Sequence, residues 1–91
     1  MTETNDRSEF TRPFADPLGS AWEAVGVEDV VAHGKMGVRL AFRRPGSDPD
    51  VVLPSRVTFN SREAADFALR TLGEKELQRR LTLAQAEAGA V

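Results

Sequence analysis

Residues 36–44 read MGVRLAFRR, and this stretch decides the fold because apolar and polar side chains alternate along it. The side chains on one side are Met36, Val38, Leu40 and Phe42. The side chains on the other are Gly37, Arg39, Ala41 and Arg43. Successive side chains of a β-strand point to opposite faces. The pattern therefore predicts a strand with one face on a core and the other on solvent or a partner.

A second strand is expected just before this stretch, over residues 27–32, which are rich in β-branched valine. Residues 33–35 (HGK) predict a hairpin turn between the two strands, because glycine tolerates positive φ. Val30 and Val31 cannot both face the core of a regular strand. We therefore expect either a bulge near Asp29 or two partly covered faces.

A third strand is expected over residues 51–59, after a loop over 45–50 that is rich in proline, glycine and aspartate. Pro54 lies inside this strand and cannot donate a hydrogen bond to a neighbour. The third strand is therefore expected to break at Pro54 or to lie at an edge of the sheet.

A short helix is predicted before the strands, over residues 16–26. Asp16 is a good N-cap, and Pro17 suits the first helical position because its missing N–H costs nothing there. The apolar residues at helical spacing are Leu18, Ala21, Trp22 and Val25. Gly26 then supplies a residue that ends a helix.

A longer helix is predicted after the third strand. Asn60 as N-cap and Glu63 three residues later resemble a capping box, and Gly73 ends the helix. Its apolar stripe is Ala64, Ala65, Phe67, Ala68, Leu69 and Leu72. The expected (i, i+4) ion pairs are Arg62 with Asp66 and Asp66 with Arg70. This helix is expected to pack on the sheet.

A last helix is predicted over residues 74–88, with a narrow stripe. Its members are Leu77, Leu81, Ala84 and Ala88. Such a seam suits docking on another helix better than covering a wide core. We therefore expect the first three of these residues to contact a protein partner or a second copy of the chain.

The predicted fold is a single α+β domain over residues 16–88 in the order α-β-β-β-α-α. It is a three-stranded antiparallel meander with the helices on one sheet face. Residues 1–15 are expected to be a disordered polar tail, and residues 89–91 a frayed end. Phe10 and Phe14 stand out in the tail, and they are expected to dock on the domain itself or on a partner.

Composition narrows the class of protein. The chain has no cysteine, which excludes disulfides and fits a reducing compartment. Its first residues lack the basic and apolar regions of a signal peptide, and no apolar run approaches the ~20 residues of a membrane span. We therefore expect a cytoplasmic protein without a membrane partner. Arginine outnumbers lysine ten to two, which suggests a GC-rich bacterial or phage genome.

Motifs for chemistry are absent from the sequence. There is no phosphate-binding glycine loop and no dinucleotide fingerprint. His33 is the single histidine, and the usual zinc sites need a cluster of His or Cys residues. Asp48 and Asp50 supply too few ligands for a calcium-binding loop. The sequence therefore predicts no enzyme, no cofactor, no metal site and no small-molecule substrate.

A cluster of cations lies in the middle of the chain, where residues 31–62 carry six basic and two acidic side chains. The expected basic patch on the outer sheet face is Lys35, Arg39, Arg43, Arg44 and Arg56. Three interpretations stay open: a solvated face partnered by the acidic N-terminal segment, a site for an acidic protein, or a nucleic-acid site. Nucleic-acid binders usually interleave aromatic residues, and the pI of about 5.3 also disfavours that alternative.

The favoured interpretation of function is a small non-enzymatic interaction module, an accessory or regulatory protein that binds a protein partner or itself through the C-terminal helix. The alternative is a nucleic-acid-binding protein that uses the arginines of the outer sheet face.

Overall fold

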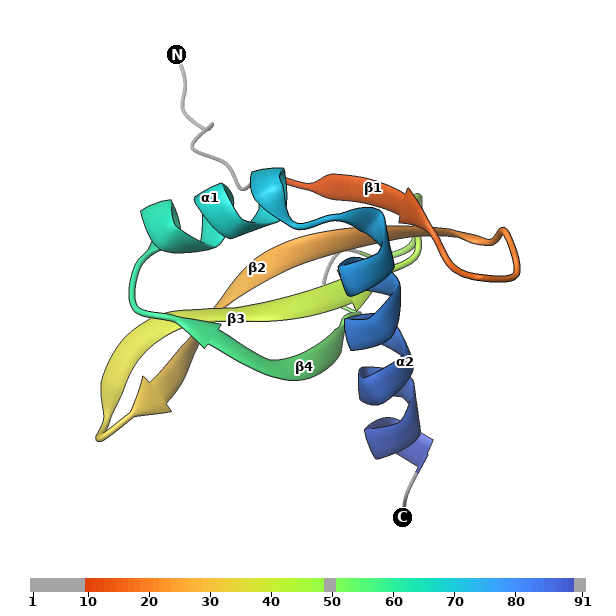
Figure 1. Ribbon diagram of the computed structural model, residues 1–91. Helices are drawn as coiled ribbons and strands as arrows, with labels where there is room; N and C mark the ends of the chain where they lie inside the picture. Colours follow the sequence, from red (N-terminus) through yellow and green to blue (C-terminus); the bar gives the residue numbers. More distant parts are fainter. Residues whose placement is uncertain (1–9, 49–50, 90–91) are drawn as a thin grey trace.

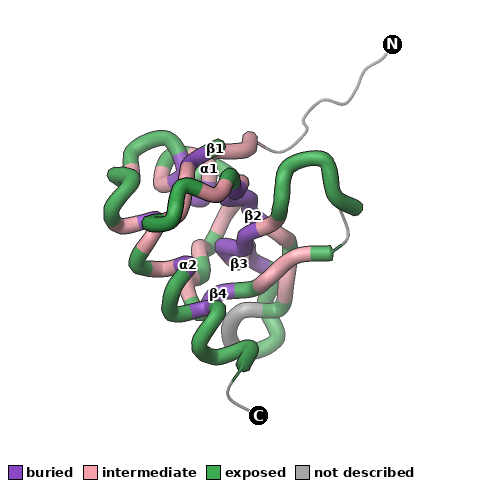
Figure 2. Tube along the Cα trace, turned by 90° about the vertical axis from the view of Figure 1, so that its right-hand side faces the viewer, coloured by how far each residue is buried: buried purple, intermediate pink, exposed green. Residues whose placement is uncertain are grey.

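The computed structural model describes residues 10–48 and 51–89, and these residues form one antiparallel sheet followed by two helices (Figure 1). The elements are β1 (Arg12–Ala15), β2 (Ala21–Ala32), β3 (Lys35–Arg43), β4 (Leu53–Phe59), α1 (Arg62–Thr71) and α2 (Glu74–Gly89). The strands are neighbours in the sheet in the same order as in the chain. Both helices lie on one face of the sheet (Figures 1 and 2).

The predicted N-terminal helix over 16–26 is wrong, because this segment forms a tight turn and the first part of β2. The Asp16 carboxylate, expected to cap a helix, accepts hydrogen bonds from the N–H groups of Leu18 and Ser20 at 2.9 and 2.8 Å. Gly19 has φ +89°, a left-handed conformation that helps to reverse the chain. The observed order is therefore β-β-β-β-α-α rather than α-β-β-β-α-α, still within the α+β class.

The additional strand, β1, falls in the segment 1–15 that the sequence predicts to be a polar tail; residues 1–9 lie outside the described residues. Antiparallel pairing with β2 puts Phe14 opposite Trp22. The Phe14 ring also meets Phe42 edge to face, with ring centroids 5.8 Å apart. A strand this short is held in place because its aromatic side chain enters the core.

The three predicted strands are confirmed as β2, β3 and β4, although β2 is longer than expected. The predicted hairpin turn is confirmed too, with positive φ at His33 (49°) and Gly34 (74°). A bulge, one of the two outcomes expected for the adjacent valines, lies near the end of β2, where the register shifts between Val30 and Ala32.

The far end of the β2–β3 hairpin projects beyond β4, which pairs with β3 only as far as Val38. Val30 and Met36 face each other across this projecting end. Met36 was expected on the core face, but its side chain is exposed at this projecting end, beyond the last β3–β4 pair.

Helix α1 begins one residue later than predicted. Ser61, rather than Asn60, is the N-cap, and its hydroxyl accepts an N–H of the first turn at 3.1 Å. The helix packs over Gly26, where a Cβ would lie 2.7 Å from Val38 Cγ1 and 2.8 Å from Arg62 Nη1. The missing side chain lets α1 approach β2, and Arg62 donates to the Gly26 carbonyl at 3.1 Å.

Two other expectations for α1 are wrong. Phe67, expected in the buried stripe, points away from the sheet and is exposed. The expected ion pairs of Asp66 are not formed among the described residues, because Arg62 turns to β2 and the Arg70 guanidinium lies 5.6 Å from the Phe10 ring centroid. The Oδ1 atom of Asp66 is buried without a hydrogen-bond partner.

The core lies between the sheet and the helices, and its buried residues come from both (Figure 2). Its buried members are Phe14, Trp22, Ala24, Leu40, Phe42, Leu69, Leu77, Leu81 and Ala84. Helix α2 crosses the sheet from β1 to β4. Near its N-terminus, Glu74 accepts the N–H of Ala15 at 3.1 Å and Gln78 donates to the carbonyl of Ala15 at 2.8 Å, which pins α2 to β1.

No helix in the described part of the chain is both long enough and apolar enough to cross a membrane.

Candidate functional site

Strand β4 is irregular at its centre, and the irregularity shapes one edge of the sheet. Between two regular pairs, Leu40 of β3 faces the three β4 residues 55–57. Pro54 comes directly before them and has no N–H to donate to β3. The Ser55 hydroxyl replaces the lost contact, since it donates to the Leu40 carbonyl at 2.7 Å and accepts the N–H of Val57 at 3.1 Å.

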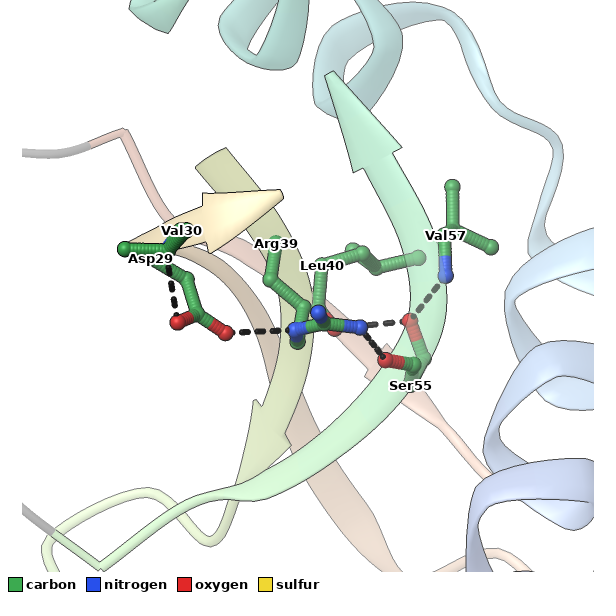
Figure 3. A network of polar contacts seen from close by, with 6 residues as sticks. All are labelled: Asp29, Val30, Arg39, Leu40, Ser55 and Val57. Carbon is green, nitrogen blue, oxygen red and sulfur yellow. Dashed lines mark hydrogen bonds and ion pairs between the residues drawn. The ribbon is translucent and has the colours of Figure 1, made fainter. Parts of the chain in front are cut away.

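The irregular part of β4, residues 55–57, is called here the β4 bulge. Arg39 contacts it from the outer face of the sheet (Figure 3). Its Nη1 donates to the Ser55 carbonyl at 2.9 Å, and its Nε pairs with Asp29 at 2.7 Å. The second oxygen of Asp29 accepts the N–H of Val30 at 2.7 Å. The hydrogen bond from Arg39, followed by that from Val30, lowers the pKa of Asp29. One guanidinium thus ties β2 to β4 across β3.

Helix α2 and the bulged part of β4 border a groove of about 130 Å³, called here the β4–α2 groove. Its lining residues are Pro54, Ser55, Arg56, Val57, Arg80, Leu83, Ala84 and Glu87. Leu83 is 47% exposed, so a large apolar side chain of the lining faces solvent. A shallower depression of about 420 Å³ shares part of this lining and reaches Asp29 and Arg39.

The rim of the β4–α2 groove is charged. Arg56 of β4 pairs with Glu87 of α2 at 2.8 Å, and Arg80 pairs with Glu76 on the same helix at 2.7 Å. The Arg56 side chain is almost fully solvent-exposed, and such surface pairs contribute only about 0–1 kcal/mol. The rim residues can therefore exchange partners at little cost in stability.

An apolar wall with a charged rim suits the binding of an aliphatic side chain that has polar neighbours. Among the described residues, no group of three or more His, Cys, Asp or Glu side chains could hold a metal ion. His33 lies exposed at the β2–β3 turn and does not line the groove.

The structure separates most of the residues expected to form one basic patch, although Arg39 and Arg56 line the same depression. Arg39 and Arg43 are on the outer sheet face, and both are paired there, Arg43 with Glu23 at 3.0 Å. Arg56 borders the groove, and Lys35 is exposed beside the β2–β3 turn. The acidic partners, Asp29 and Glu23, come from β2. They belong to the acidic N-terminal segment, which one of the three interpretations expected to partner this face.

Arg44 belongs to a separate cluster near the turn between β1 and β2. Its guanidinium lies 4.1 Å from the Trp22 ring centroid, and its Nη1 donates to the Ala21 carbonyl at 3.0 Å. The indole N–H of Trp22 donates to Asp16 at 3.1 Å. The pKa of Asp16 is lowered, chiefly by the hydrogen bond from the Ser20 amide and further by the indole. These contacts fix the turn to the end of the sheet.

The residues expected to bind a partner are largely buried in the chain's own core. Leu77, Leu81, Ala84 and Phe14 are buried, and Phe10 packs partly buried against them. In this fold a partner can reach α2 only through its other side chains. Leu83 is the residue that the sequence reasoning missed. The signal was its position off the Leu77–Leu81–Ala84 stripe, which leaves a leucine on the flank of the helix.

Several backbone N–H and C=O groups at the free edges of the sheet form hydrogen bonds with side chains. On β1, both backbone groups of Ala15 bond to α2. Beyond the end of β1, Arg62 occupies the Gly26 carbonyl of β2. These contacts disfavour the addition of a further strand at these positions.

No protein-family model matches this chain, and no curated protein or solved structure shows significant similarity to it.

Proposed function

We propose that this chain is a non-enzymatic protein-interaction module that holds an aliphatic side chain of a protein partner in the β4–α2 groove. The observation that supports this function is Leu83, a large apolar side chain exposed on the wall of a groove with an apolar lining. Burying an exposed aliphatic side chain of the partner against Leu83 stabilises a complex by about 1.5–3 kcal/mol, enough to anchor a short segment.

The chemistry of the partner follows from the surroundings of the groove. Arg39, Arg56 and Arg80 line the groove and its adjoining depression together with Asp29 and Glu87. Glu76 pairs with both Arg80 and Arg79, so four arginines face three carboxylates here, although the whole chain has a net charge of −2. A matching segment carries an aliphatic residue next to Asp or Glu. Recognition uses the side chains of the groove, since the exposed apolar surface of its wall belongs to the Leu83 side chain.

Selection of short random peptides displayed on phage against the purified full chain tests this function. The enriched peptides are expected to share an aliphatic residue beside an acidic one. Leu83→Ser is expected to weaken the best peptide about tenfold, as measured by fluorescence anisotropy, because the aliphatic side chain of the peptide loses the apolar wall that buries it and about 1.4 kcal/mol corresponds to a tenfold change.

Leu18→Ser is the matched control, since Leu18 is 92% exposed and does not line the groove. It is expected to leave peptide affinity unchanged. Equal affinity of the wild type and Leu83→Ser, or a selection that enriches no peptide, contradicts the proposed function.

A further inference from the structure

Helix α1 exposes one face that the core does not use. Phe67 at its centre is 64% exposed. Its exposed neighbours three and four residues away are Glu63, Ala64, Arg70 and Thr71. Residues at this spacing share one face of a helix. Ala65 and Leu69, which the sheet buries, lie on the opposite side of α1.

This face of α1 carries a negative charge near its N-terminus and a positive charge near its C-terminus. Glu63 lies in the first turn and Arg70 in the last turn of α1, with Phe67 between them. Glu63 and Arg70 lie along the same flank of the face, and the small residues Ala64 and Thr71 lie along the other. A second copy of the helix, turned end for end, therefore places Glu63 of each chain opposite Arg70 of its partner.

From this self-complementary pattern we infer that α1 is the contact surface of a homodimer, in which two α1 helices pack antiparallel with Phe67 at the two-fold axis. In such an isologous interface, each favourable contact occurs twice. The small side chains on the second flank allow the helices to approach. The antiparallel arrangement also brings each helix N-terminus near the C-terminus of the other, where their dipoles attract.

The size of this surface sets the strength of the dimer. A helix of ten residues is about 15 Å long, so the contact is smaller than the roughly 1,600 Å² of a standard stable interface. The dimer is therefore weak and forms as the protein concentration rises. This interface is separate from the β4–α2 groove, so either can be correct without the other.

Sedimentation equilibrium of the full chain over a wide concentration range at low salt tests the inference. The mass is expected to rise from 9.9 kDa toward twice that value. Glu63→Arg alone and Arg70→Glu alone each place like charges opposite each other, and each is expected to weaken the dimer about tenfold or more. The double variant is expected to restore it, and a mixture of the two single variants is expected to form heterodimers.

Phe67→Ser gives an independent check, because Phe67 is exposed and its loss leaves the core intact. It is expected to abolish the dimer while circular dichroism stays that of the wild type. Leu83→Ser is expected to dimerise like the wild type, which separates this surface from the groove. A wild type that stays monomeric at every concentration, or a charge-reversed double variant that is not restored, overturns the inference.

Discussion

Ser55 is a small residue on which the irregular part of β4 depends. Its hydroxyl donates to the Leu40 carbonyl and accepts the Val57 N–H, and the residue is 8% exposed. Both groups would otherwise lack a partner, because the bulge removes the regular contact with β3. Leaving a buried polar group unpaired costs about 1–3 kcal/mol.

We therefore expect Ser55→Ala to lower the free energy of unfolding by about 1–3 kcal/mol, as measured by urea denaturation. Ser47→Ala is the matched control, because the Ser47 hydroxyl also donates to a backbone carbonyl at 2.7 Å but lies in an exposed loop, where water replaces it. Equal losses for the two variants would show that burial at the bulge is not the cause.

At the scale of elements, the turn between β1 and β2 shows how one carboxylate redirects a segment. Asp16 accepts two backbone N–H groups and the Trp22 indole, and this keeps residues 16–20 as a turn. A helix N-cap uses the same carboxylate-to-amide bond. The hydrogen bonds of Asp16 therefore suit both the predicted helix and the observed turn. The packing of the following residues decides which of the two forms.

Because the folded protein lowers the pKa of Asp16, ionised Asp16 stabilises the fold above the ordinary pKa of an aspartate, about 3.9. This contribution is lost as the pH falls through the lowered folded-state value. We expect Asp16→Asn to be less stable than the wild type at neutral pH, with a difference that shrinks below about pH 4. Thermal unfolding of both proteins across this range measures it. Leu18→Ser, in the same turn, is expected to show no such pH dependence.

At the scale of the whole molecule, α2 completes the core. Leu77 and Leu81 are buried against the sheet, although their narrow stripe suggested a surface for another helix. The stripe is narrow because only part of α2 lies over the sheet, while its C-terminal half borders the groove at the edge of β4.

Leu77→Glu combined with Leu81→Glu is therefore expected to unfold the domain, because it buries two charges without partners. Loss of the circular dichroism signal and of a cooperative urea transition measures this. Leu83→Glu, on the exposed flank of the same helix, is expected to stay folded. A double variant that keeps a native transition would show that α2 is not needed for the core.

Some features of the fold were predictable because they depend on neighbours in the sequence. The alternation over 36–44 specified β3, the glycine turn at 33–34 joined it to β2, and Gly73 separated two helices. Each of these signals acts within a few residues, where backbone sterics and side-chain spacing leave little choice. The α+β class and the last two helices followed from them.

The candidate site could not be predicted in the same way. Pro54 was recognised as a break or an edge, but the bulge beside it depends on Arg39 and Asp29, which lie far away in the chain. The groove forms only where α2 passes that bulge. The sequence places Leu83 off the buried stripe of its helix, but it does not indicate that Leu83 borders a groove.

By itself, the sequence determined the strand alternation, the hairpin turn and the positions of both C-terminal helices, because these follow from local spacing and backbone preference. Tertiary structure alone decided that residues 16–26 form a turn and a strand, that Phe14 and Leu77 are core residues, and that Arg39 and Arg43 are paired. The physical reason is that one apolar spacing fits both a helix face and a strand, and that only the gain from burial between distant segments selects one of them.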